Sequence, residues 1–138
     1  MKKSAGFTLI ELLVVVVIIG MLAAFVAPKY FDQVGKSSSK IAKAQIVALE
    51  QGLDQYRLDT GHYPTTEIGL SGLMLKPTSD AVEKWQGPYL KKDPPNDPWG
   101  NPFIYRAPGQ DGREYDLLSY GADGKPGGSG QDADITSW

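Results

Sequence analysis

The sequence predicts an α+β fold in which one long N-terminal helix packs against a small antiparallel β-sheet. An apolar run from Phe7 to Ala27 leads directly into a segment with helical periodicity that ends near Thr60. Two short segments rich in strand-forming residues follow, at 103–106 and 114–120. The 16 Gly and 10 Pro residues are concentrated after residue 60, which predicts loops between these elements.

The run from Phe7 to Ala27 is long enough to cross a membrane as one helix. Its 21 residues carry a single charge, Glu11, and a helix of this length spans about 30 Å. Lys2 and Lys3 precede the run, so the positive-inside tendency places the N-terminus in the cytoplasm and the rest of the chain across the membrane. The alternatives are a simple anchor and a secretory signal cleaved at an alanine within 23–27.

Glu11 is the unusual residue of this run. An ionised carboxylate inside an apolar membrane helix costs about 2.5–3.5 kcal/mol on insertion scales, and less near the interface. Such a residue usually marks a functional contact, so Glu11 is a candidate site residue.

The segment 28–60 is expected to be an amphipathic continuation of the same helix. Pro28 should kink the helix without ending it, because the helical pattern resumes beyond it. The predicted stop is Thr60-Gly61, with Gly61 as the C-terminal cap. The predicted apolar stripe consists of Ile41, Ala44, Ala48, Leu49, Gly52, Leu53 and Tyr56.

Residues 61–138 are expected to form a globular head. A short helix is predicted at Ile68 to Leu75. The two strands at 103–106 and 114–120 are joined by 110–113, which contains the Asp-Gly dipeptide of a hairpin turn. The residues assigned to the core against the long helix are Trp99, Phe103, Tyr105, Tyr115 and Leu117.

Composition excludes several classes of function. The 14 basic and 16 acidic residues give a net charge of −2, which argues against nucleic acid as a partner. No Cys is present, which excludes disulfides and thiolate metal sites. The single His leaves little basis for a His-based zinc site or a Ser–His triad. The phosphate-cradling motif G-x-x-x-x-G-K-[ST] is also missing from the sequence. No nucleophile–base pair is apparent, so the chain is not expected to be an enzyme.

The C-terminal stretch after Gly121 contains three carboxylates around a Gly-rich loop: Asp123, Asp132 and Asp134. A flexible tail is one interpretation. The other is a folded-back loop that binds Ca²⁺ through carboxylates and backbone carbonyls, since Ca²⁺ takes about six to eight oxygen ligands. The loop is not an EF-hand, because Lys125 stands where the third ligand would be.

The N-terminal sequence GFTLIELLVVVVIIGMLAAFVAP resembles the prepilin signature of type IV pilins and pseudopilins. The resemblance implies that residues 1–6 are a leader, that a prepilin peptidase cuts between Gly6 and Phe7, and that Phe7 is then N-methylated. It also gives Glu11 a partner, because its carboxylate can neutralise the new amine of Phe7 in the same or a neighbouring subunit. On this basis Glu11 is expected to set the register of stacked helices.

Four motifs of the head are similar to the major pseudopilins of type II secretion systems: T-G-x-Y-P-T-T-E-x-G-L at 60–70, G-P-Y-L-K-K at 87–92, D-P-W-G-N-P-F-x-Y at 97–105 and L-S-x-G-A-D-G-K-P-G-G at 118–128. The resemblance implies a pilin-like fold whose C-terminal loop holds one structural Ca²⁺. The side-chain ligands carried over are Asp123, Asp132 and Asp134. Leu118 and Ser119 are carried over as carbonyl ligands. Which of Asp132 and Asp134 binds directly stays open.

The function implied by this resemblance is structural. The chain is expected to be held in the inner membrane by a single span, with its head in the periplasm, and to polymerise into a pseudopilus that drives export of folded proteins through the outer membrane. Its implied partners are further copies of itself, minor pseudopilins, the inner-membrane secretion platform and the prepilin peptidase. The alternatives are a type IV pilin or competence-type pseudopilin, a membrane-anchored periplasmic enzyme, and a calcium-binding module.

Overall fold

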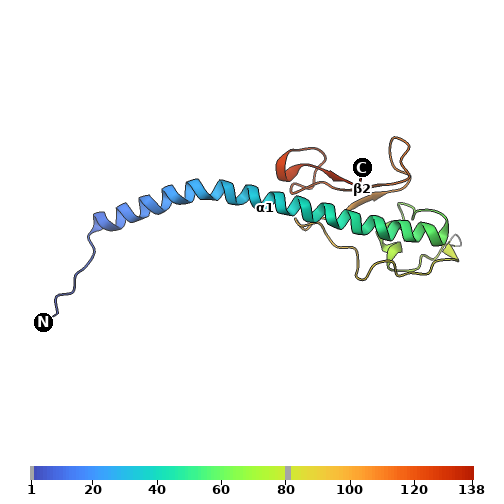
Figure 1. The fold of residues 1–138 in the computed structure, drawn as a ribbon, viewed down its shortest axis with the longest axis horizontal. Coiled ribbons are helices and arrows are strands. Elements are labelled where there is room, and N and C mark those ends of the chain that lie inside the picture. Colours follow the sequence, from blue (N-terminus) through green and yellow to red (C-terminus); the bar gives the residue numbers. More distant parts are fainter. Residues whose placement is uncertain (1, 80–81) are drawn as a thin grey trace. The chain divides into compact units, whose positions relative to one another are not determined.

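The computed structural model describes residues 2–79 and 82–138. The chain divides into two compact units, Met1–Gly35 and Lys36–Trp138. Helix α1 (Leu9–Thr60) contributes to both units, and all the other elements belong to the second (Figure 1). An α+β fold with a long N-terminal helix and a small antiparallel sheet is therefore confirmed.

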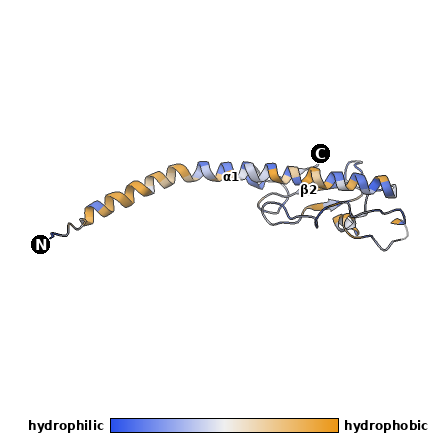
Figure 2. Ribbon diagram, turned by 60° about the horizontal axis from the view of Figure 1, so that its bottom comes forward, coloured by the Kyte–Doolittle hydropathy of each residue, from blue (hydrophilic) through white to orange (hydrophobic). Residues whose placement is uncertain are grey.

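In the first unit, α1 consists almost entirely of exposed apolar residues. Its N-terminal part is long and apolar enough to cross a membrane, and none of that apolar window is buried. Pro28 lies inside α1, so the helix continues beyond it as predicted. Figure 2 shows the change in character along α1: hydrophobic residues follow one another at first and then alternate with hydrophilic ones.

In the second unit, one face of α1 is buried in the head. The buried side chains recur every three or four positions: Ala42, Ile46, Leu49, Leu53 and Tyr56. The predicted stripe is wrong at three positions, because Ile41, Ala44 and Ala48 are exposed. The exposed fraction of Ile41 is 50%. The line through these three residues reaches Gln51 and Gln55 farther along the helix, whereas the buried line stays apolar as far as Tyr56.

Helix α1 ends where the sequence predicts. Gly61 has a φ of +86°, and its N–H donates to the carbonyl of Arg57 at 2.7 Å. A left-handed residue directly after the helix is favourable for Gly because it has no Cβ to clash with the preceding turn. The next element, η1 (Gly69–Leu73), is a 3₁₀-helix, shorter than the helix predicted for 68–75.

The sheet contains three antiparallel strands in the order β1-β2-β3. Strand β1 (Ile104–Arg106) pairs with β2 (Asp116–Ser119), with Tyr105 opposite Leu117. The connecting turn is the predicted one: Arg113 N–H donates to Gln110 O at 3.0 Å, and both Asp111 and Gly112 have positive φ. Positive φ at both central residues is the type I′ geometry that matches strand twist.

Strand β3 (Ile135–Thr136) was not predicted. It pairs with β2, with Ser119 opposite Ile135, and Ser137 N–H donates to Leu117 O at 2.9 Å. The interpretation of the C-terminal stretch as a flexible tail is therefore wrong. A two-residue strand has no alternation of its own, so nothing local in the sequence predicts it.

The core of the head lies between α1, η1 and the sheet. Its buried members are Ile46, Leu49, Leu53, Tyr56, Leu73, Val82, Phe103, Tyr105 and Leu117. The predictions for Phe103, Tyr105 and Leu117 are confirmed, and Tyr115 packs against this cluster while partly exposed. Trp99 is half-buried and is not among the residues of the cluster, so its assignment to the core is wrong.

Candidate functional sites

The predicted processing site lies before the start of α1. Residues 2–8 have no regular secondary structure and are exposed, with Phe7 exposed by 84%. A Cβ added at Gly6 would meet no atom within 4 Å. The Gly6–Phe7 bond is therefore in an open, irregular segment, which is the kind of backbone that a peptidase can reach.

Glu11 makes its contacts inside its own chain. The Thr8 N–H donates to Glu11 Oε2 at 2.8 Å, and the Glu11 N–H donates to Thr8 Oγ1 at 3.3 Å. This reciprocal pair is a capping box, which satisfies two N–H groups at the start of a helix. The sequence interpretation missed it, although T-x-x-E before an apolar run is its signature. The cap also explains why α1 begins at Leu9 and not at Phe7.

In the C-terminal loop, the three predicted carboxylates are exposed and belong to one folded-back segment. Asp123 Oδ1 accepts from Lys125 N–H at 3.0 Å. Both carboxylate oxygens of Asp134 lie 3.1 Å from Gly127 N, which donates to them. Asp132 lies in the short 3₁₀-helix η3 (Gly130–Asp132). The loop thus uses two of its three carboxylates to hold its own backbone.

The loop has two arms, one that carries Asp123 and one that carries Asp132 and Asp134, and they meet at Gly121. Ala122 N–H donates to Gln131 O at 2.8 Å. Gly121 has a φ of +72°, and a Cβ there would lie 2.7 Å from Gln131 O and 2.8 Å from Ala133 O. Only Gly permits so close an approach in this conformation. Backbone carbonyls from one arm therefore surround the start of the other.

The donor chemistry of the loop fits Ca²⁺, which accepts carboxylates and backbone carbonyls together. Within 2–79 and 82–138, no three His, Cys, Asp or Glu side chains are grouped as metal ligands, so carbonyls would have to complete the shell. Of the two predicted carbonyl ligands, Leu118 is paired with Ile104 and Thr136, and Ser119 with Ile135. Both residues therefore lie in strand β2, and their carbonyls are fixed by the strand backbone and not by the loop.

A buried carboxylate that the sequence interpretation overlooked lies beside this loop. Asp97 is 4% exposed. Its Oδ1 accepts from Trp99 N–H at 3.1 Å and from Asn101 N–H at 2.9 Å, and its Oδ2 accepts from Ser119 Oγ at 2.7 Å. Asp at the first position of a Pro- and Gly-containing turn was the available signal. No local pattern in the sequence indicated that Ser119, 22 residues away, would be its partner.

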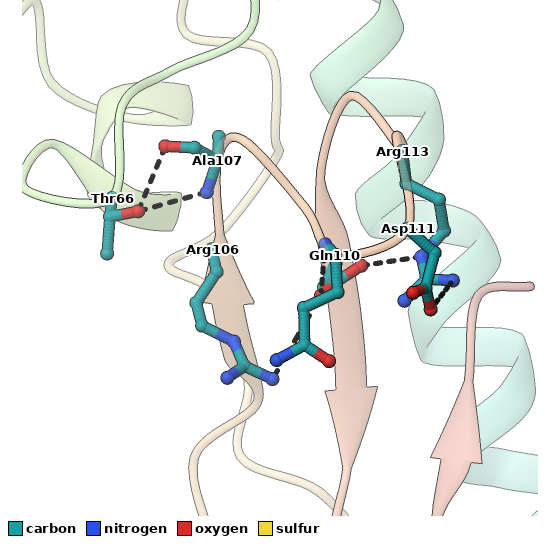
Figure 3. A network of polar contacts seen from close by, with 7 residues as sticks. Thr66, Arg106, Ala107, Gln110, Asp111 and Arg113 are labelled. Atoms are coloured by element: carbon teal, nitrogen blue, oxygen red, sulfur yellow. Dashed lines mark hydrogen bonds and ion pairs between the residues drawn. The ribbon is translucent and has the colours of Figure 1, made fainter.

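A second buried carboxylate, Asp116, lies at the base of the β1–β2 hairpin. Figure 3 shows two of its partners, Gln110 and Arg113, at the turn of this hairpin. Arg113 Nε donates to its Oδ1 at 2.7 Å, and Gln110 N–H donates to its Oδ2 at 3.1 Å. Burial by itself would raise the pKa of Asp116, but these hydrogen bonds and the charges of Arg113 and Arg106 outweigh it and hold the pKa below its usual value. Arg113 also lies over the ring of Trp138, 4.0 Å from its centroid.

Two family profiles together match almost the whole chain. The profile described as "Prokaryotic N-terminal methylation motif" matches residues 1–27. The profile described as "Type II secretion system (T2SS), protein G" matches residues 29–138. The chain belongs to the type II secretion system protein G family.

Individual relatives agree with this membership. The chain is 50% identical to the type II secretion system core protein G of Pseudomonas aeruginosa, over 99% of this chain and 96% of the relative. It is 47% identical to the protein of the same name from Vibrio cholerae, over 100% of this chain and 94% of the relative. The crystal structure of the major pseudopilin from the type 2 secretion system of enterohaemorrhagic Escherichia coli is similar, with a TM-score of 0.63 and 38% identity over 75% of this chain and 88% of that one.

Membership of the protein G family confirms the resemblance to major pseudopilins. It also confirms that the chain is a structural component and not an enzyme. The match of residues 1–27 to a methylation motif, together with the apolar helix in this region, fits a membrane-anchored pseudopilin.

Proposed function

We propose that this chain is the major structural subunit of a type II secretion pseudopilus, a periplasmic filament whose growth drives folded proteins through the outer membrane. The proposal rests on two family matches that occur in the same chain: the methylation motif at 1–27 and protein G at 29–138. An apolar helix that could cross a membrane occupies the first of these regions, and a folded head occupies the second. Its partners are further copies of itself, minor pseudopilins and the inner-membrane secretion platform.

The proposed life cycle begins in the inner membrane. The chain is inserted as a single span with Lys2 and Lys3 in the cytoplasm and the head in the periplasm. Prepilin peptidase cuts between Gly6 and Phe7 and the new N-terminus is methylated. The exposure of residues 2–8 supports access to this bond.

Mass spectrometry of the membrane-extracted protein tests this processing. The expected product begins at N-methylated Phe7. Because cleavage removes the leader and not the apolar helix, the product should stay in the membrane fraction. An intact N-terminus, or a product cut within 23–27, would contradict the proposal.

For assembly, the proposed contact joins Glu11 of one subunit to the Phe7 amine of a neighbour. Two opposite charges that are desolvated together attract far more strongly than in water. The capping box supports this role, because it holds the Glu11 side chain at the start of α1, where it bonds Thr8, one residue after Phe7. Before assembly the Glu11 carboxylate accepts a hydrogen bond from the Thr8 N–H. In the filament it would also pair with the Phe7 amine of a neighbouring subunit.

For the head, the proposed cofactor is one structural Ca²⁺ in the C-terminal loop, with Asp123, Asp132 and Asp134 as candidate side-chain ligands and the carbonyls of Leu118 and Ser119 as candidate backbone ligands. When bound, the ion would cross-link a Gly-rich loop in a chain that has no Cys. Small domains without disulfides often depend on such a metal.

Removal of calcium with a chelator measures how much the ion stabilises the folded head. An ion present at 100 times its dissociation constant stabilises the folded state by about 2.7 kcal/mol. Addition of EDTA should therefore lower the melting temperature of the head, and excess CaCl₂ should restore it. Asp123→Ala should melt at the chelated temperature with or without calcium. A melting temperature that does not respond to either reagent would contradict a structural calcium.

A further inference from the structure

The turn formed by residues 97–101 holds Gly121 by both of its backbone polar groups. Ser119 Oγ, which donates to Asp97 Oδ2 at 2.7 Å, accepts from Gly121 N–H at 3.1 Å. Asn101 Nδ2 donates to Gly121 O at 3.3 Å. The N–H of Gly121 is thus connected to the turn through Ser119, and its carbonyl is connected directly.

The turn is itself rigidly tied. Asp97 N–H donates to Asn101 O at 2.8 Å, and Gly100 N–H donates to Asp97 O at 2.9 Å. The buried Asp97 carboxylate receives three donors, from Trp99, Asn101 and Ser119. A buried carboxylate with this many donors has one orientation available, because any rotation would leave a donor unsatisfied.

Gly121 is the point at which the arm carrying Asp123 passes the arm carrying Asp132. Ala122 N–H is bonded to Gln131 O, and the backbone approach at Gly121 leaves no room for a side chain. A displacement of Gly121 would therefore change the separation of the two arms and of the oxygen donors on them.

We propose that Asp97 is a positioning residue for the C-terminal loop: through Ser119 and Asn101 it fixes Gly121 and so preorganises the calcium ligands. This inference rests on the proposed calcium site and adds to it a residue that does not touch the ion. The physical basis is the cost of ordering a Gly-rich loop on binding, which is reduced when part of the loop is already fixed. Asp97 acts on calcium affinity, while the ligands themselves stay unchanged.

The test is a calorimetric titration of the full chain in detergent micelles with CaCl₂, after removal of bound metal. Asp97→Asn replaces the Oδ2 acceptor by an amide donor, so the Ser119 hydroxyl loses the acceptor that fixes it. Ser119→Ala removes the same link while keeping the Ser119 carbonyl. Each variant is expected to bind calcium at least tenfold more weakly, with an unchanged helical circular dichroism spectrum.

Asp116→Asn is the matched control. Asp116 is also a buried carboxylate in a network of donors, but it lies at the other end of β2, against Arg113 and Gln110. Its substitution should lower the melting temperature in EDTA and leave the dissociation constant for calcium unchanged. A role of Asp97 in general stability alone would give the two variants the same profile.

The possible failures are distinguishable. If the unsubstituted chain does not bind calcium, the calcium site itself is overturned. If it binds, and both Asp97→Asn and Ser119→Ala bind equally well, only the positioning role is overturned. The same is true if Asp116→Asn weakens binding as much as they do. Ser119→Ala keeps the test decisive where Asp97→Asn fails to fold.

Discussion

Asp116 is buried at the base of the β1–β2 hairpin and is held there as an anion by Arg113 and by the Gln110 N–H. Removing one partner of a buried, hydrogen-bonded charge pair leaves the other uncompensated. The short hairpin is therefore stabilised by a charge interaction as well as by its turn and its two strands.

The Asp116→Asn substitution should cost about 2 kcal/mol of unfolding free energy near neutral pH, in the range for hydrogen bonds to charged groups. The pKa of Asp116 is lower in the folded chain than in the unfolded one. Its contribution is thus complete above the unfolded value, about 3.9, and is lost as pH falls through the folded value. Denaturant unfolding of both proteins should show a difference that is constant from pH 5 to 7 and shrinks below about pH 4. A difference that grows on acidification would contradict this interpretation.

The burial and the hydrogen-bond partners of individual side chains were the features least predictable from the sequence. Both buried carboxylates, Asp97 and Asp116, escaped it, because an Asp in a turn or strand is ordinarily exposed. Asp97 is buried by a partner 22 residues away, which local sequence does not reveal. The Thr8–Glu11 capping box, by contrast, is a local pattern and could have been predicted.

Among the elements, those fixed by local chemistry were predicted and those fixed by packing were not. The end of α1 at Thr60 and the Asp111-Gly112 turn depend on Gly and Asp at positions that require positive φ. The phase of the buried stripe on α1 and the existence of β3 depend on what packs against them. Two apolar lines run along 41–49, and contact with the head buries the one that stays apolar as far as Tyr56.

The selection of the buried line can be tested with a matched pair on α1. Ile46 is completely buried in the head core, whereas Ile41 is 50% exposed. Ile46→Ala should destabilise the head by about 2–5 kcal/mol, since it leaves a cavity. Ile41→Ala should change the free energy of unfolding by at most about 0.5 kcal/mol. Urea unfolding of the full chain in detergent measures both, and equal effects would show that the buried face is assigned wrongly.

At the scale of the whole molecule, a helix long and apolar enough to cross a membrane is continuous with one that packs in a head without Cys. The sequence motifs were sufficient to predict the family, because the methylation motif and the protein G motifs extend over nearly the full length. The positions of the loop carboxylates could not be predicted from their spacing. Two of them are bonded to Lys125 N–H and Gly127 N–H, contacts that only the folded loop defines.

Glu11, the single charge of the apolar helix, is proposed to serve assembly. In cells that lack their own major pseudopilin, the unsubstituted chain and the Glu11→Leu variant are expressed at equal levels, and sheared filaments are collected and imaged. We expect both proteins to be inserted and cut before Phe7, and only the unsubstituted chain to form filaments. Filaments of normal abundance from Glu11→Leu would contradict this role of Glu11.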